Sequence, residues 1–519
     1  MWPRFGIKIG NSTLCIAHVK SDGKPEVIAN KQGDRNSQAC LLWDGAEEIE
    51  CGLTAKQKMA TRPKQAVANS FQLLMPQELG TQRLATAIKE LPCHYDTLSH
   101  TFQLKCQIYD DKSDETKENM HELTSFEVQV ALFCAELELA RQYHVGDKKP
   151  IVVLSIPCYY PKSAWRELAR AAEKAGFHVA QIVTEPTAAI LAYGIGEQQD
   201  ATEVINSNGE SKDITQYILT IKCGGLNSHF AWYAVRDGLY TQLSAYGPFD
   251  IGGKHFTDEL VQFICEEFKR KYKLDPHESR RSLAKIRNAA TSCKHILTTL
   301  PSTQIYIDSL MDGVDFNAQM SRARFESLIQ PVINTFMQTL NDCVERALTE
   351  HTEIRVINSI VLLGATMRIP KLQAAIAARF PDAQLHLNIS ADEVVAIGCA
   401  RQATFLHTPL EQDLLATEER IYVEEDLLIW HGNDEANAKV LIGKGTALPR
   451  KVNLELKQDK VSEGNCSVIR VRAGEKVNEV SLEGVTPANN GIYRIEADID
   501  CKQVGAESIR TPRLRIRVL

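Results

Sequence analysis

Apolar and polar positions change their spacing along the chain, and the spacing predicts two kinds of structure. Up to about residue 410, short apolar runs alternate with segments whose apolar positions recur every three to four residues. Strands that alternate with amphipathic helices are typical of α/β domains in which helices cover the sheets. The run 151–156 predicts a buried strand, and Thr124-Ser125-Phe126-Glu127 is a capping box that predicts a helix reaching about His144.

Two further helices follow from the same pattern. One spans Ser163 to Ala175 and ends at Gly176, and the other runs from Arg322 to about 349 with a bend at Pro331. The segments 107–122 and 197–213 are expected to be exposed loops.

Beyond about residue 412 the pattern changes to short alternating runs separated by turn residues. An acidic stretch ends in Asp426-Leu427-Leu428-Ile429, and six runs predict strands over 439–443, 452–456, 467–472, 479–482, 493–497 and 513–519. We therefore expect an α/β domain over 1–411, an acidic and leucine-rich linker over 412–429, and a β-sandwich over 430–519. The last strand reaches the end of the chain, so no helical segment is expected after it.

Composition narrows the range of functions. The net charge of −7 over 519 residues gives no global field that would recruit DNA or a membrane surface. No apolar stretch is long enough to span a membrane, and the N-terminus has no signal-peptide core. The fourteen cysteines include no Cys-x-x-Cys pair, which is typical of reduced thiols and predicts no metal site. We expect the protein in the cytosol, with the nucleus as an alternative.

A small-residue turn between two apolar strands occurs twice. The first is Gly10-Asn11-Ser12, which follows Lys8, and the second is Gly224-Gly225, which follows Lys222. Glycines let backbone N–H groups approach an anion closely, so two such turns facing each other could clamp a polyphosphate. A lysine before each turn adds positive charge and leaves no ligand for magnesium. Two ordinary hairpin turns would give the same local pattern.

Longer stretches resemble the heat shock protein 70 family of chaperones along nearly the whole chain. The matching stretches stand in family order: 27–30, 33–35, 184–189, 192–194, 250–253, 321–326, 362–371, 392–393 and 398. The resemblance implies an actin-like, two-lobed nucleotide-binding domain made of duplicated, ribonuclease H-like halves. A β-sandwich, which binds peptides in ordinary members, would follow it. Typical members continue into a helical lid, and we expect none here.

The resemblance also assigns roles to individual residues. Those expected to contact the nucleotide phosphates are Lys8, Gly10, Asn11, Ser12, Lys222, Gly224, Gly225, Gly252 and Gly253. Those expected around the adenosine are Lys294, Thr298, Gly364, Arg368 and Asp392. Coupling between the domains is assigned to Pro157, Asp426, Leu427 and Leu428, whereas Trp165 replaces an arginine that couples the domains in the family.

Three departures from the family pattern affect hydrolysis. Lys8 and Lys222 replace the two aspartates near the metal, and Phe71 replaces the catalytic lysine that orients water and stabilises charge at the γ-phosphate. Glu185 is retained and could still order water as a residual catalytic group. The two lysines could contact phosphate, or each could pair with a nearby carboxylate such as Glu185 and hold the lobes together without a ligand.

The resulting hypothesis is a lidless chaperone or co-chaperone that binds ATP or ADP without a need for magnesium and with weak or absent hydrolysis. Like the atypical ribosome-associated members, it would work with a J-domain partner. It would act on nascent or unfolded polypeptides at the ribosome, and it would bind neither DNA nor a membrane. The alternative is an active, ATP-hydrolysing chaperone that cycles on unfolded proteins. A sugar or acetate kinase of the same superfamily is a third option, against which the linker and the β-sandwich argue.

Overall fold

The chain forms two compact units, residues 1–411 and 412–519, and each is treated by itself. The computed structural model describes residues 4–20, 22–45, 49–110, 115–143, 149–196, 215–236, 239–406, 427–431, 438–442, 450–457, 468–473, 476–481, 492–503 and 510–518.

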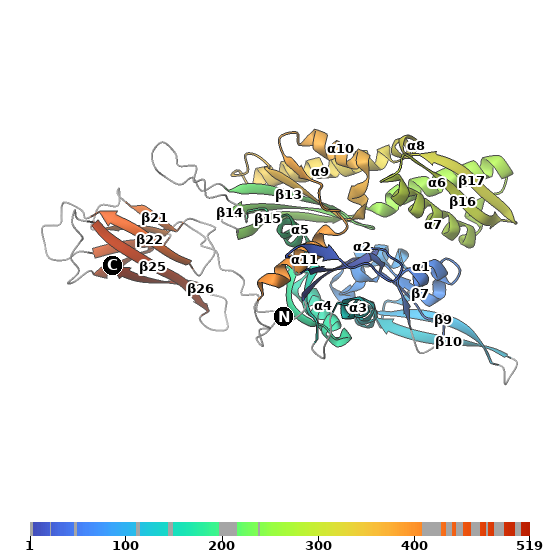
Figure 1. The fold of residues 1–519 in the computed structure, drawn as a ribbon, viewed down its shortest axis with the longest axis horizontal. Coiled ribbons are helices and arrows are strands. Elements are labelled where there is room, and N and C mark those ends of the chain that lie inside the picture. Colours follow the sequence, from blue (N-terminus) through green and yellow to red (C-terminus); the bar gives the residue numbers. More distant parts are fainter. Residues whose placement is uncertain are drawn as a thin grey trace. The chain divides into compact units, whose positions relative to one another are not determined.

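Two central sheets in the N-terminal unit repeat one topology. The first has the order β12-β11-β1-β2-β3, built from β1 (Arg4–Ile9), β2 (Thr13–Val19), β3 (Pro25–Val27), β11 (Ile151–Ile156) and β12 (His178–Thr184), with β4 (Ser37–Gln38) beside β2. The second has the order β15-β14-β13-β18-β19, built from β13 (Gln216–Cys223), β14 (Ser228–Arg236), β15 (Leu239–Phe249), β18 (Ser359–Leu363) and β19 (Gln384–His386). In each, an antiparallel meander is extended by two parallel strands. This duplication defines a first and a second lobe (Figure 1) and agrees with the expected two-lobed fold.

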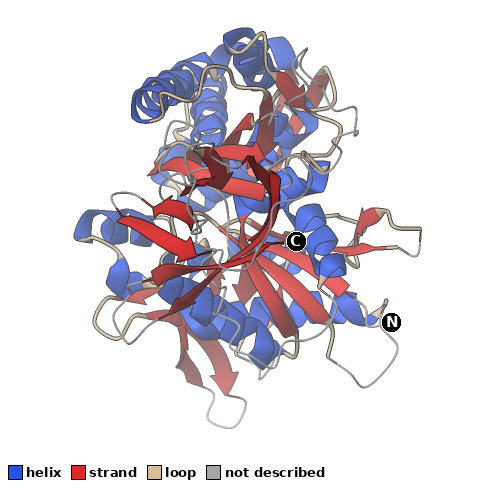
Figure 2. Ribbon diagram, turned by 90° about the vertical axis from the view of Figure 1, so that its left-hand side faces the viewer, coloured by secondary structure: helices blue, strands red, loops and turns tan. Residues whose placement is uncertain are grey.

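Helices cover the sheets of both lobes (Figure 2). The first lobe carries α1 (Leu53–Met59), α2 (Thr81–Lys89), α3 (Ser125–Arg141), α4 (Lys162–Ala175) and α5 (Glu185–Tyr193). The second carries α6 (Gly253–Tyr272), α7 (Arg280–Leu297), α8 (Arg322–Leu328), α9 (Gln330–Glu350) and α10 (Pro370–Arg379). The last helix, α11 (Val394–Phe405), packs on β1 and α5 and so returns the chain to the first lobe.

Smaller sheets complete the lobes. In the first lobe they are β5 (Cys40–Leu42) with β6 (Glu50–Cys51) and β7 (Ala66–Ala68), and β8 (His94–Asp96) with β9 (Thr101–Asp110) and β10 (Glu115–Thr124). In the second lobe β16 (Ser302–Met311) pairs with β17 (Val314–Ser321). No helix in the described part of the chain is long and apolar enough to cross a bilayer.

Local sequence signals predicted several element ends correctly and failed at two places. The capping box at Thr124 is formed, and α4 ends where Gly176 adopts a left-handed φ of 114°. The predicted bent helix is instead two helices that meet at Ile329, because Pro331 lacks an N–H and is placed in the first turn of a new helix. The segment 107–122, predicted to be a loop, lies largely in the β9–β10 hairpin, while 197–213 lies outside the described residues.

Each lobe has its own aromatic core, and a third apolar cluster joins the lobes. Phe5, Phe102 and Phe133 lie in the first core and Phe230 and Phe256 in the second. The joining cluster combines residues of β2, α5, β13, β18 and α11, so the two lobes share a hinge built of small aliphatic side chains.

The C-terminal unit contains two antiparallel sheets. One has the order β21-β20-β23-β24, from β20 (Leu427–His431), β21 (Lys439–Ile442), β23 (Val468–Ala473) and β24 (Lys476–Ser481). The other has the order β22-β25-β26, from β22 (Arg450–Lys457), β25 (Ile492–Gln503) and β26 (Arg510–Val518).

All six strands predicted for the C-terminal unit are present, but residues 427–429, assigned to the linker, lie in β20. They belong there because Leu427 and Ile429 are buried between hydrogen-bonded neighbours.

The close crossing of α11 and α5 makes Gly398 a strong test of the hinge. A Cβ atom at Gly398 would lie 1.7 Å from the carbonyl oxygen of Ala188, so Gly398→Ala should cost at least about 3 kcal/mol of unfolding free energy. Gly80→Ala is the control because a Cβ there meets nothing within 4 Å, and since Gly80 caps α2 the expected cost is at most about 1 kcal/mol. Denaturant titration of both variants tests this, and equal midpoints would contradict it.

Candidate nucleotide-binding site

The two glycine turns lie against each other between the lobes. Each is closed by a hydrogen bond from its own glycine N–H, at 3.1 Å for Gly10 and 2.9 Å for Gly224. A Cβ atom on Gly225 would lie 2.1 Å from the Oγ of Ser12, so a larger residue there would force the Ser12 side chain to turn away. The fold therefore brings together two turns that are separated by more than two hundred residues of sequence.

A third glycine turn packs on the second. Gly253 N donates to Gly224 O at 2.8 Å, at the start of α6. A Cβ on Gly252 would lie 2.4 Å from the backbone of Leu226, which is buried. All three predicted phosphate turns thus converge, and the N-terminal end of α6 adds the partial positive charge of a helix dipole.

Lys222 is neutralised by the chain itself. Its Nζ forms an ion pair with Oε2 of Glu185, and both side chains are buried, with Glu185 0% exposed. Glu185 begins α5, where the helix dipole also favours a negative charge. Its other oxygen, Oε1, has no hydrogen-bond partner in the structure. Of the two alternatives for this lysine, pairing with Glu185 is the one present.

Lys8 lies close to the same carboxylate but is held by neutral groups. Its Nζ donates to Oγ1 and O of Thr13, at 3.0 and 3.3 Å, within its own hairpin. Burial lowers the pKa of Lys8, the nearby Glu185 opposes that shift, and Lys222 adds to it. The site therefore contains two lysines for a single carboxylate.

The charged side chains at the turns, Lys8, Lys222 and Glu185, do not fit a magnesium ion. Mg²⁺ requires oxygen ligands, usually carboxylates, in octahedral geometry, whereas the one carboxylate here is already paired with Lys222. Within the described ranges, no three His, Cys, Asp or Glu side chains gather as a metal ion would require. No chemical step is therefore assigned to a metal at this site.

The position aligned with the catalytic lysine lies in the core of the first lobe. Phe71 is 2% exposed, and its ring centroid lies 5.4 Å from that of Tyr160, whose hydroxyl donates to Phe71 O at 3.0 Å. Tyr159 extends this cluster, and its ring meets the edge of His229 on β14 at 5.4 Å. Aromatic contacts thus run from the first lobe to the second, and a lysine at position 71 would bury its ammonium group there.

His229 and the two tyrosines were missed by the sequence analysis. His229 is buried, neither ring nitrogen has a partner in the structure, and burial holds its pKa well below the usual value, so it is neutral. Its register position opposite Lys222 was available as a signal, because the tight turn fixes which residues of β13 and β14 face each other. No local pattern indicated that Tyr159 would reach the other lobe.

Near the predicted adenosine position, the side chain of Lys294 forms hydrogen bonds with the protein itself. Its Nζ donates to Gly253 O at 2.7 Å and to Oγ1 of Thr257 at 2.8 Å. Burial lowers the pKa of Lys294 to about 8, so the side chain is still mostly charged at neutral pH. It fastens α7 to the third glycine turn.

Two of the predicted adenosine residues line a cavity of about 250 Å³. These are Thr298 and Arg368, and the remaining lining residues are Leu362, Pro370, Gln373, His386, Leu387, Ile389, Ser390 and Ala391. Arg368 also contacts Asp392 at 3.3 Å. Gly364 has a left-handed φ of 92° and lies outside this lining, with its N–H bonded to Ala391 O.

The residues predicted to couple the domains lie in different settings. Pro157 lies between β11 and α4, where its carbonyl accepts the N–H of Tyr160 at 3.2 Å. Leu427 and Leu428 are paired with β23 and β21 in the C-terminal sheet, and Asp426 lies outside the described residues.

Duplicated sheets with facing glycine turns define the actin-like class of nucleotide-binding proteins. Sequence comparison narrows this class: a family model described as Hsp70 protein matches residues 4–514. Similar proteins called heat shock 70 kDa protein 14 include those of Macaca fascicularis (31% identical), Rattus norvegicus (32%) and Homo sapiens (32%), each covering 97% of this chain and 95% of the relative. The chain belongs to the Hsp70 family, which confirms the family predicted from the sequence.

The buried ion pair predicts a large and non-additive effect on stability. Lys222→Met leaves the buried Glu185 carboxylate uncompensated and should cost about 3–5 kcal/mol of unfolding free energy. The double variant Lys222→Met/Glu185→Gln should recover much of that loss. The exposed pair Lys31–Glu138 is the matched control, and Lys31→Met should be indistinguishable from wild type in the same denaturant titration. A double variant that is no more stable than Lys222→Met would contradict the pairing.

Proposed function

We propose that this Hsp70-family protein binds ATP or ADP between the three glycine turns, hydrolyses ATP weakly or not at all, and acts as a chaperone or co-chaperone. The observation that carries the proposal is the buried ion pair of Lys222 and Glu185. It takes up the one acid retained for hydrolysis while leaving the turns in place.

Binding is supported by unsatisfied groups and by charge. Buried polar atoms nearly always have a partner, so Oε1 of Glu185 and the ring nitrogens of His229 indicate a place for water or for a polar ligand. Lys8 adds a cation beside turns whose N–H groups suit an anion. The cavity at Thr298 and Arg368 is of a size to take a purine base.

Weak hydrolysis follows from what the residues can do. Phosphoryl transfer to water requires a positioned water and a group that stabilises charge at the γ-phosphate. Phe71 provides neither, and the charge of Glu185 is offset by Lys222. In place of a bound magnesium, Lys8 would supply the positive charge, because the charge of Lys222 is offset by Glu185.

Nucleotide binding should therefore not depend on magnesium. With a fluorescent ATP analogue, excess chelator should change the dissociation constant by less than about twofold, and single-turnover release of phosphate should stay near background. The variant Lys8→Asp/Lys222→Asp is the matched comparison and should acquire a magnesium requirement. Loss of wild-type binding on chelation would contradict the proposal.

A second candidate function is the active, ATP-hydrolysing chaperone. The free Oε1 of Glu185 favours it, because that oxygen could still orient an attacking water. Phosphate release from bound ATP at a rate comparable to ordinary family members would decide for this alternative.

For partners, we propose a J-domain co-chaperone and action on nascent or unfolded polypeptides at the ribosome, in the cytosol with the nucleus as an alternative. The support is the resemblance to atypical ribosome-associated members, together with the departures at Lys8, Lys222 and Phe71.

This partnership predicts that the tagged protein co-purifies with a J-domain protein and sediments with polysomes in a sucrose gradient. Puromycin and high salt, which release nascent-chain and ionic contacts, distinguish the mode of attachment. A protein found only in the light fractions, without a J-domain partner, would count against the proposal.

A further inference from the structure

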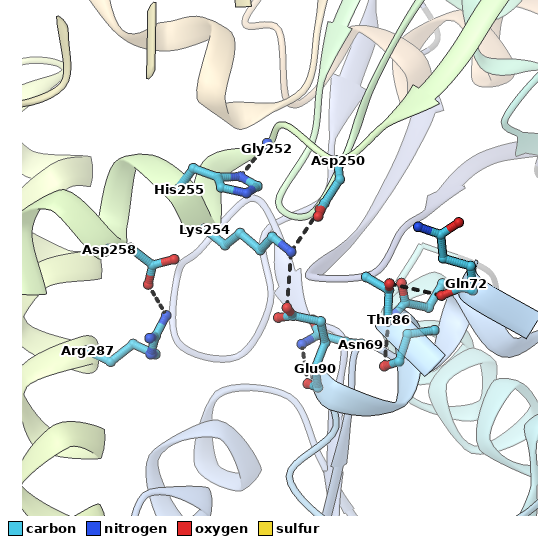
Figure 3. Close-up of polar contacts among 12 residues, drawn as sticks. Asn69, Gln72, Thr86, Glu90, Asp250, Gly252, Lys254, His255, Asp258 and Arg287 are labelled. Carbon is cyan, nitrogen blue, oxygen red and sulfur yellow. Dashed lines mark hydrogen bonds and ion pairs between the residues drawn. The ribbon is translucent and has the colours of Figure 1, made fainter. Parts of the chain in front are cut away.

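Lys254 forms a second ion pair between the two lobes. It stands in the first turn of α6, in the second lobe, and its Nζ contacts Oε1 of Glu90, the residue that ends α2 in the first lobe, at 3.0 Å. Asp250 provides a second carboxylate at 2.8 Å. Figure 3 shows the ammonium group between these two acids, which come from different lobes.

The setting favours a stable contact. The side chain of Lys254 is 15% exposed and that of Glu90 is 29% exposed, so solvent screens this pair less than an ordinary surface pair. Burial by itself lowers the pKa of Lys254, but the hydrogen bonds to Asp250 and Glu90 more than offset it, and the net shift is upward.

Glu90 is connected to the first glycine turn. The side chain of Asn69 donates to Glu90 O at 3.0 Å and that of Gln72 donates to Ala87 O at 3.2 Å, which fixes the end of α2 to the 3₁₀ turn at Ser70–Leu73 (Figure 3). The N–H of Gln72 in turn donates to Oδ1 of Asn11 at 2.8 Å.

Lys254 is connected to the second glycine turn through its own backbone, since its N–H donates to Gly225 O at 2.8 Å. Ser12 and Gly225 are in contact. Hydrogen bonds, one ion pair and the packing contact of Ser12 with Gly225 thus form a closed ring that passes through both turns. The Lys254–Glu90 contact is the link of the ring that consists only of flexible side chains from opposite lobes.

We propose that Lys254 and Glu90 form a latch that holds the two lobes together and sets how long a bound nucleotide stays. Opening the ring at this link lets α2 and α6 separate and frees the turns to move apart. The residence-time part rests on the proposed function, because it presupposes a nucleotide between the turns. The other part, that the latch holds the lobes together, does not depend on a bound nucleotide.

The test uses the full-length protein in Lys254→Gln, Glu90→Gln and the charge swap Glu90→Lys/Lys254→Glu. Arg270→Gln is the matched control, because Arg270 and Glu267 form an ion pair of 2.6 Å within α6 of the second lobe. Two measurements are made: amide hydrogen exchange over residues 69–74 and 224–228 without nucleotide, and stopped-flow release of a fluorescent ADP analogue.

Each single variant should speed exchange in both segments and release ADP about fivefold faster, whereas the swap should return both values toward wild type. The control should match wild type. Unchanged exchange and release in both single variants would overturn the latch and leave the proposed function standing. A wild-type protein that binds no nucleotide would overturn the proposed function and the residence-time part, and hydrogen exchange would then decide the latch alone.

Discussion

A carboxylate that is wholly shielded from water has to be compensated by a charge or by hydrogen bonds, and Glu185 imposes this requirement on the centre of the molecule. Lys222 satisfies it from the facing lobe, and the ion pair consequently fixes β13 against the start of α5. The remaining features follow from that placement. The second glycine turn begins one residue after Cys223 and so meets the first turn, while His229, opposite Lys222 in the hairpin, is buried without charge.

Because the sheets are duplicated in two lobes, a single pair of charges between the lobes can affect their relative arrangement. Each lobe has its own aromatic core, and in the described part of the chain the lobes meet through the cluster around α5 and α11, the Tyr159–His229 ring contact, the glycine turns and a few ion pairs. Contacts such as Lys222–Glu185 and Lys254–Glu90 therefore determine which relative arrangement is held.

Several side chains at the candidate site bind other parts of the protein. Phe71, at the position predicted for the catalytic lysine, packs against Tyr160, and Lys294 supports a glycine turn through Gly253 and Thr257. Each of these side chains supports the fold of the protein itself. The three glycine turns are closed and joined by backbone hydrogen bonds, which do not depend on these side chains.

The sequence by itself determined the features that depend on neighbours in the chain: the alternation of strands and helices, the capping box at Thr124, the glycine turns, and the family. It placed Phe71 at the catalytic position but could not show that the ring is buried against Tyr160. The tertiary structure decided which acid pairs with Lys222, which groups Lys294 binds, and that Leu427 lies in a strand rather than a linker. The reason is physical: periodicity and turn chemistry act over a few residues, whereas the partner of a buried charge and the pairing of a short strand depend on segments brought together only when the whole chain has folded.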